Sequence, residues 1–237
     1  MIATIVNCAS ILIGSAIGFV FKKSVHDEAK HVVFTSIGLM TFVIGFSMAL
    51  NSSRILFLTL SLVLGGVLGH ALHIEKGILK FGEFLKGIVA KEESESTRLF
   101  AQGFLDASVL FCVGAMAIVG SFQAGAEGSY DLLFTKSVLD GFMAILFTAA
   151  MGLGVAFSAI TVLIYQGVLT LLASYIRPYV SELLLTEISA CGGVLIIMIG
   201  FNLLELRKIK TANFLPALIF MVLFIFLEPL LELIPIL

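Results

Sequence analysis

The chain has 237 residues, of which 59% are hydrophobic and 13% charged, and its mean hydropathy is +1.13. Soluble domains are about 45–50% apolar and about 25% charged, so this composition supplies too few charged groups for a water-facing surface. We therefore predict an all-α, polytopic integral membrane protein.

Charge and cysteine placement exclude several other classes. With 14 basic and 16 acidic residues the net charge is −2, and without a basic face we predict no nucleic-acid partner. Cys8, Cys112 and Cys191 lie far apart in apolar runs, which predicts small core residues rather than disulfides or a metal site. In residues 1–23 the lysines follow the apolar run, the reverse of a cleavable signal peptide, so we expect a retained first span.

Apolar runs tile nearly the whole chain. Because a bilayer core of about 30 Å needs roughly 20 helical residues, we predict about eight spans in a single transmembrane domain, residues 1–237. These spans are 2–21, 32–50, 55–73, 99–122, 137–155, 158–176, 188–206 and 213–233. As one helix, residues 137–176 would extend about 60 Å, so we expect this stretch to fold back around Gly152 and Gly154.

Basic residues predict the orientation, because short cytoplasmic loops are enriched in Lys and Arg. Eight spans with the amino terminus outside place every basic residue on the cytoplasmic side except Arg54, Lys136 and Arg177. Three of the four tyrosines then fall at the outer boundary, as interfacial aromatics do. Both termini are therefore predicted to lie outside.

The main polar segment lies between the third and fourth spans. Its first part, residues 75–91, is amphipathic, with Ile78, Phe81, Leu85 and Ile88 on one face and charged side chains opposite. We expect this part to lie along the cytoplasmic membrane surface.

Two internal repeats predict an inverted symmetry. Asp106 in the fourth span and Asp140 in the fifth both follow a leucine and precede a glycine by fourteen residues. The run Ile-Gly-Phe at 44–46 in the second span recurs at 199–201 in the seventh. In the assigned topology the matched spans run in opposite directions. Spans one to three would then mirror six to eight, and four would mirror five, about an axis in the membrane plane.

Asp106 and Asp140 are the main candidates for binding a proton or cation. An acid within a span costs roughly 2.5–3.5 kcal/mol at mid-helix, which favours a functional role. The alternative is that each is an interfacial residue near the start of its helix, favoured by the positive end of the helix dipole. Amides within spans would complete the polar lining, or would hydrogen-bond between helices instead. The candidate amides are Asn7, Gln166, Asn202 and Asn213.

The remaining titratable groups suggest no chemistry. Glu228 and Glu232 share a face of the last span. They are either ordinary terminal carboxylates or a cation vestibule at the outer end. His70 and His73 have helical metal-ligand spacing, but at a span terminus we expect them to be solvated. No nucleophile, H-E-x-x-H or phosphate-loop motif is present. We therefore predict no enzymatic activity, no metal and no cofactor.

Five ordered stretches resemble a known family. They are LFCVGAMAIVGSFQAG at 110–125, KSVLDG at 136–141, SAITVLIYQGVLTLLA at 158–173, IGFNLL at 199–204 and ANFLPAL at 212–218. Together they are similar to the YdfK/YqgA-like family, a domain-of-unknown-function family of bacterial inner-membrane proteins, over essentially the whole chain. The resemblance implies a multi-pass protein of the bacterial inner (cytoplasmic) membrane, and it transfers no substrate and no functional residue.

Our leading hypothesis is a small-solute or ion transporter, coupled to a proton or cation, with its polar residues between two inverted halves. Pro216 and the Gly152/Gly154 turn would interrupt helices and expose backbone carbonyls there. Two alternatives stay open: a non-transporting membrane scaffold or partner subunit, and an ion channel. The expected partners are the lipid bilayer and a small ion or solute, and a homo-oligomer stays open as well.

Overall fold

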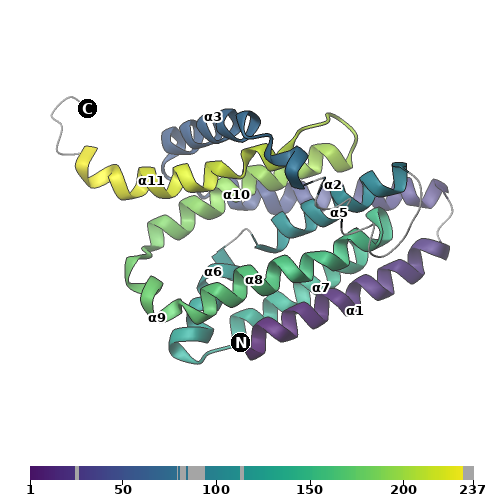
Figure 1. Cartoon of the computed structure of the whole chain (residues 1–237), viewed down its shortest axis with the longest axis horizontal. Coiled ribbons are helices and arrows are strands. Elements are labelled where there is room, and N and C mark those ends of the chain that lie inside the picture. The colour runs from purple at the N-terminus through teal and green to yellow at the C-terminus, as the bar shows by residue number, and fades with distance from the viewer. Residues whose placement is uncertain (25–26, 79, 81–83, 85–93, 113–114, 232–237) are drawn as a thin grey trace.

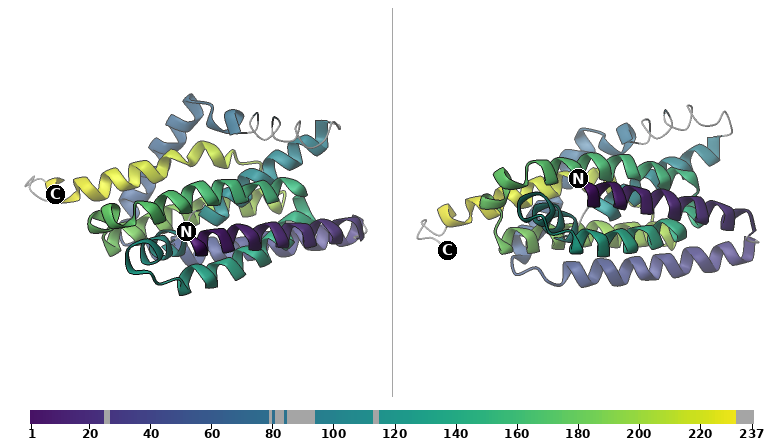
Figure 2. Two further views of the ribbon diagram at one scale, coloured as in Figure 1. Left: turned by 60° about the horizontal axis from the view of Figure 1, so that its bottom comes forward. Right: turned by 90° about the horizontal axis from the view of Figure 1, so that it is seen from below.

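The computed structural model describes residues 1–24, 27–78, 80, 84, 94–112 and 115–231, and every regular element in these ranges is a helix. Figure 1 shows the long helices side by side along the long axis of the molecule, and Figure 2 shows the same bundle from two other directions. The α-helices are α1 (Ile2–Ser24), α2 (Asp27–Ala49), α3 (Ile55–Ala71), α5 (Ser94–Cys112), α6 (Ala115–Phe122), α7 (Asp131–Met151), α8 (Ser158–Leu171), α9 (Ala173–Ile176), α10 (Glu182–Leu203) and α11 (Pro216–Leu231). Shorter helical segments are η1 (Gln123–Glu127), η2 (Leu153–Phe157), η3 (Arg177–Tyr179) and η4 (Thr211–Phe214).

Length and composition identify the membrane-crossing candidates among the described residues. Five helical segments are long and apolar enough to cross a bilayer: α1, α7, α8 with η2, α10, and α11 with η4. The bent pair α5 and α6 is a sixth candidate if its two parts form one span, and α2 and α3 supply shorter apolar helices. The all-helical class is therefore confirmed, whereas the count of about eight spans stays a prediction.

The fold-back between residues 137 and 176 is confirmed. Gly14 and Gly18 of α1 pack against Gly141 and Ile145 of α7, so α1 and α7 run in the same direction. Along α8 the order is reversed, because Cys8 Sγ donates to the Ala159 carbonyl while Asn7, earlier in α1, reaches Gln166. The chain therefore turns back between α7 and α8. It does so at Gly152, whose φ of 93° is a conformation that glycine adopts without strain.

Three further helix pairs have defined directions. Gly45 of α2 faces Gly193 of α10, whereas the earlier Gly38 meets Leu204, so α2 and α10 are antiparallel. The pair α3 and α11 is antiparallel as well, because Phe57 stacks on Phe224 near one end while Gly69 meets the 213 backbone near the other. By contrast, α5 runs parallel to η2 and α8, through Phe100 with Phe157 and Ser108 with Thr161. These directions agree with the alternation expected of eight consecutive spans.

Several helices begin earlier than the predicted spans, and α7 and α10 are clear examples. The structure starts α7 at Asp131 and α10 at Glu182, ahead of the predicted residues 137 and 188. An acid in the first turn is favoured by the helix dipole, and Ser181 caps α10 by accepting from the Leu184 amide. The predicted spans did not include these first turns, because their polar residues lower the local hydropathy. Lys136, expected in an outer loop, therefore lies within α7.

One predicted element lies mostly outside the described residues. Residues 79, 81–83 and 85–93 lie outside the described residues. The amphipathic segment predicted at 75–91 consequently stays a prediction.

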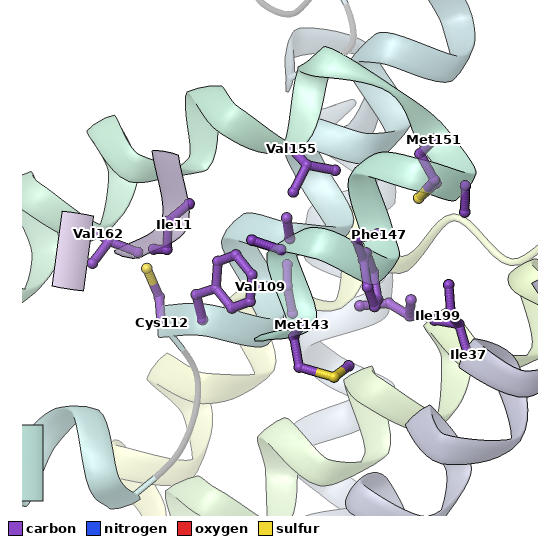
Figure 3. Packing of buried hydrophobic residues seen from close by; sticks show 14 of the residues in the cluster. Ile11, Ile37, Val109, Cys112, Met143, Phe147, Met151, Val155, Val162 and Ile199 are labelled. Atoms are coloured by element: carbon purple, nitrogen blue, oxygen red, sulfur yellow. The ribbon is translucent and has the colours of Figure 1, made fainter. Parts of the chain in front are cut away.

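The largest hydrophobic core joins side chains from α1, α2, α5, α7, α8 and α10, and Figure 3 shows Ile11, Val109 and Phe147 converging there. Cys8, Cys112 and Cys191 are all free; Cys112 and Cys191 are buried, as predicted for small core residues, whereas Cys8 is only partly buried. Large apolar side chains also cover the outer faces, for example Ile13, Val67 and Ile219, each more than 60% exposed. Such faces are expected where acyl chains, rather than water, surround the helices.

Candidate functional site

Lys136 and Asp140 form a buried ion pair one turn apart on α7. Lys136 Nζ donates to Asp140 Oδ2, and the two residues are only 6% and 7% exposed. Residues four apart share one face of a helix, so α7 alone brings them together. Taking two charges out of water costs several kcal/mol per ion, which only close pairing and further hydrogen bonds can offset.

Two amides from other helices complete this cluster. Asn7 Nδ2 of α1 lies 3.0 Å from both Asp140 Oδ2 and Gln166 Oε1 of α8. Gln166 Nε2 in turn lies 3.4 Å from Thr4 Oγ1, which links the cluster back to α1. Among the described residues Asn7 Oδ1 has no hydrogen-bond partner, although it is buried. The structure thus brings together three predicted residues, Asn7, Asp140 and Gln166.

Glycines allow α1 to reach the pair. A Cβ atom at Gly14 would lie 2.2 Å from the Gly141 carbonyl oxygen, and one at Gly18 would lie 2.3 Å from that of Ile145. Only helices without side chains at these points approach so closely. The close contact of α1 with α7 places the short side chain of Asn7 within hydrogen-bonding distance of Asp140.

The ion pair lines a cavity of about 650 Å³ between α2, α5, α6, α7 and α10. Most of the lining is apolar, including Phe111 and three methionines. Its polar side chains are Ser47, Asn51, Lys136, Asp140, Thr186 and Ser189. Ser189 Oγ is buried and has no partner within the described part of the chain. The polar lining lies at the end of the bundle where α2 stops and where α7 and α10 begin.

Asp106 lies on α5 and is not part of the Asp140 cluster. It is fully buried, Gln102 Nε2 donates to its Oδ1 at 2.9 Å, and its Oδ2 has no partner among the described residues. The charged group that acts on it is a second carboxylate, Glu75. Its neighbours Leu105 and Val109 line another cavity of about 440 Å³, but the lining of this cavity does not include Asp106.

Asn202 and Asn213 do not join the Asp140 cluster. Asn202 holds the turn after α10, since its Nδ2 donates to the Ile209 carbonyl and its Oδ1 accepts from the Ile209 amide. Asn213 Oδ1 accepts from the Glu75 amide, and Glu75 accepts from the Ala212 amide, which joins the end of α3 to η4. Both amides therefore satisfy backbone groups at helix ends.

Sequence reasoning missed two buried charges. Lys136 was assigned to the outer surface, although its separation of four residues from Asp140 is the signal that could have identified the pair. Glu187, just before a predicted span, is fully buried and accepts from Ser52 Oγ at 2.6 Å and from the Ser53 and Arg54 amides at 2.7 and 3.1 Å. Glu187 thus fixes the turn between α2 and α3.

The remaining acids have simpler surroundings. Glu228 pairs with Arg54 at 2.5 Å, and Glu232 lies outside the described residues. Within the described ranges, no group of three or more His, Cys, Asp or Glu side chains is placed to hold a metal ion. The arrangement around Asp140 therefore offers one carboxylate that can take up a proton, one ammonium group, two amides and several hydroxyls.

Comparison with known proteins identifies a family. The chain matches the family described as "Protein of unknown function (DUF554)" over residues 2–226. It is 33% identical over 224 residues to "Uncharacterized membrane protein YdfK" of Bacillus subtilis (strain 168), an alignment covering 92% of this chain and 93% of that protein. It is 26% identical over 223 residues to "Uncharacterized protein YqgA" of Escherichia coli (strain K12), with 92% and 94% covered. No solved structure matches the chain.

The family resemblance expected from the ordered stretches is therefore confirmed over nearly the whole length. The chain belongs to the DUF554 family, and one of its relatives is described as a membrane protein.

Proposed function

We propose that this protein is a transporter of the bacterial inner membrane for a small solute or ion, coupled to a proton or cation, with Lys136 and Asp140 at its binding site. One observation carries the proposal: a charged pair, buried among apolar helices, lines a cavity of about 650 Å³. Apolar residues of similar volume can often replace a buried ion pair without loss of stability. A charged pair that is buried among apolar helices is therefore better explained by a role in binding than by a role in stabilising the fold.

A scaffold, the main alternative, needs only that its buried polar groups be satisfied. Glu187, Asn202 and Asn213 fit that role, because each bonds backbone groups at helix ends. The Asp140 cluster differs. Asn7 Oδ1 in the cluster and Ser189 Oγ in the lining of the same cavity have no partner among the described residues, and unused buried hydrogen-bonding groups favour a site that takes a ligand.

Helix packing supports two inverted halves. In the proposed symmetry α1 exchanges with α8, α2 with α10, α3 with α11, and α5–α6 with α7. Several contacts follow this exchange: α1 with α7 becomes α8 with α5, and both pairs are parallel. The pairs α1–α8, α2–α10 and α3–α11 map onto themselves, and all three are antiparallel. An axis in the membrane plane requires such reversal.

Individual residues follow the same exchange. Gly38 and Gly45 of α2 are separated like Gly193 and Gly200 of α10. In the packed helices Gly45 faces Gly193 and Gly200 faces Gly38, so each contact has its symmetric counterpart. These matched contacts support the repeat more strongly than the short sequence match.

The two aspartates are also matched. Gln102 donates to Asp106 and Lys136 donates to Asp140, in both cases from four residues earlier on the same helix. In this conformation the cavity reaches Asp140, while Asp106 is fully buried. We propose that the two halves exchange roles during transport, so that Asp140 is open to the outer face in one state and Asp106 to the cytoplasmic face in the other. Both termini would lie outside.

The test is flux through the purified protein in vesicles of phosphatidylethanolamine and phosphatidylglycerol. A pH-sensitive dye inside the vesicles reports proton movement while sodium, potassium, ammonium or pyruvate is added outside. We expect one of these gradients to drive proton movement in the wild type and the Asp140→Asn variant to lose it. The matched control Asp131→Asn removes an exposed acid from the same helix and should retain the flux.

Three outcomes would contradict the proposal. Flux equal to that of empty vesicles for every gradient favours the scaffold. Flux that Asp140→Asn leaves unchanged places the pathway elsewhere in the protein. A channel would instead give currents without coupling to proton movement.

A further inference from the structure

Resting on the proposed transport function, we infer that the solute is a small organic monocarboxylate and that it enters the Asp140 cavity together with one proton. The inference starts from the charges that line the cavity. Among the described residues of that lining, Lys136 is the one cationic side chain and Asp140 the one anionic side chain. They bond to each other, so their two charges compensate in the cavity.

Charge balance dictates what the site can accept. A cation that binds Asp140 would also meet the Lys136 ammonium, and an anion that binds Lys136 would meet the Asp140 carboxylate. Either ligand alone leaves one uncompensated charge in a low-dielectric interior, which costs several kcal/mol in general. Together, an anion and a proton leave the site neutral. The proton adds to an Asp140 oxygen, the pair opens, and the freed ammonium donates to the carboxylate of the solute.

An acceptor for the added proton is already in place. Asn7 Nδ2 donates to Asp140 Oδ2, while Oδ1 of the same amide is buried and unused among the described residues. A protonated carboxyl group has an O–H donor that must find an acceptor. A turn of the Asn7 amide lets Oδ1 accept from that O–H. The cluster thus provides hydrogen bonds for both states of Asp140.

The rest of the cavity suits the solute. Ser189 lines the cavity and its hydroxyl, unpartnered in the described part of the chain, can donate to a carboxylate beside Lys136. Phe111, Met116 and Met143 supply an apolar wall for a carbon chain. A volume of about 650 Å³ lies in the range of pockets for organic ligands, about 300–1,000 Å³. A bare metal ion would leave most of it unfilled.

Other groups that face the pair do not change this balance. From α1 come Asn7 and the thiol of Cys8, from α5 the thiol of Cys112, and from α8 the amide of Gln166. Buried thiols in apolar surroundings are neutral. The hydroxyls and amides of α2 and α10 in the lining are neutral as well. Asp140 is therefore the group whose charge changes when the anion binds.

The test is isothermal calorimetry on the full-length protein in detergent, with pyruvate and phenylpyruvate as probes. Titrations in two buffers of different ionisation enthalpy give the number of protons taken up per anion. We expect one proton per anion. We also expect tighter binding at lower pH, and tighter binding of phenylpyruvate because its ring meets the apolar wall.

Two variants separate the roles of the pair. Lys136→Gln should weaken pyruvate binding at least about tenfold, since the buried cation is lost. Asp140→Asn should still bind pyruvate, but without proton uptake and without dependence on pH. The control Arg177→Gln removes an exposed cation from the η3 turn and should bind like the wild type.

Each result decides between the two proposals. Pyruvate binding that survives Lys136→Gln, or that takes up no proton in the wild type, overturns the monocarboxylate inference. Vesicle flux of sodium, potassium or ammonium that depends on Asp140, with no anion binding, also overturns it while the transporter proposal stands. Neither binding nor flux of any probe overturns both.

Discussion

The two buried aspartates have the same local geometry and different electrostatics. Each accepts a hydrogen bond from the side chain four residues earlier, which is Lys136 for Asp140 and Gln102 for Asp106. Asp140 therefore lies beside a cation, and Asp106 beside an amide and within the field of Glu75. In the described lining of the cavities above, Asp140 contributes to the cavity of about 650 Å³, whereas Asp106 contributes to neither.

This difference indicates that the two aspartates bring different charges to the two halves of the proposed repeat. An ion pair in a low-dielectric site is held by its own attraction, so it can exchange partners with a ligand of matching charges. A lone buried carboxyl group is tolerated only when protonated or when it binds a cation. One half of the proposed repeat thus holds a charged pair, and its counterpart holds a single acid.

The largest expected effect comes from separating the ion pair. Lys136→Gln and Asp140→Asn should each lower the free energy of unfolding by about 3 kcal/mol, because each leaves one buried charge without its partner. The double variant K136Q/D140N should recover to within about 1 kcal/mol of the wild type, since both charges are gone. Denaturant unfolding in detergent measures all four proteins. Additive losses in the double variant would show that the two charges act independently.

The proposed symmetry predicts equal effects at matched glycines. A Cβ atom at Gly45 would lie 2.7 Å from Ile197 Cγ1, and one at Gly200 would lie 2.6 Å from Phe42 Cδ1. Gly45→Ala and Gly200→Ala should each cost about 1–2 kcal/mol, because the packed helices must separate. Gly77→Ala meets nothing within 4 Å and serves as the control. Thermal unfolding in detergent measures the three variants, and a large loss at only one of the matched positions would argue against the repeat.

The second aspartate should be far less sensitive than the first. Asp106→Asn keeps the shape of the side chain and replaces a carboxyl group that has no cationic partner among the described residues. We expect a change in the free energy of unfolding below about 1 kcal/mol, in contrast to Asp140→Asn. The same denaturant experiment compares the two. A loss at Asp106 as large as that at Asp140 would reveal a charged partner for Asp106.

The smallest effect concerns Glu75, which acts on Asp106 from outside the spanning helices. Burial raises the pKa of the Glu75 carboxyl above its usual value of 4.5, although the Ala212 amide and nearby Lys210 oppose the rise. Because the folded pKa exceeds the unfolded one, the fold favours the protonated form. The free energy of unfolding should therefore fall as pH rises from the usual carboxyl range through the raised pKa.

Glu75→Gln should remove that fall while keeping an acceptor for the Ala212 amide. Unfolding temperatures of both proteins between pH 4 and pH 7 test this expectation. Parallel pH profiles of the two proteins would show that Glu75 does not titrate in this way.

The sequence predicted the helical class and the reversal between α7 and α8, because both follow from hydrophobic length. A bilayer limits the length of a crossing, and an apolar stretch longer than that limit must turn. The predicted start of the fifth span was too late, because Asp131 and Lys136 are charged and hydropathy assigns charged residues to loops. Whether such residues belong to a helix depends on tertiary contacts, and hydropathy carries no information about those contacts.

The site was predicted in part for a related reason. Sequence identifies amides that need partners in lipid, and it does not identify the partners. Asn7 and Gln166 meet Asp140 because glycines bring α1 against α7, whereas Asn202 and Asn213 meet nearby backbone groups. Lys136 was missed because a basic residue at the edge of an apolar run usually lies at the membrane surface.

The most direct test of the central claim is proton-coupled flux through the double variant K136Q/D140N in lipid vesicles. This protein keeps the neutral cavity and the fold but has neither charge. If the pair is the transport site, its flux should equal that of empty vesicles although it inserts and unfolds like the wild type. Flux at the wild-type rate would contradict the account, because transport would then not need the ion pair.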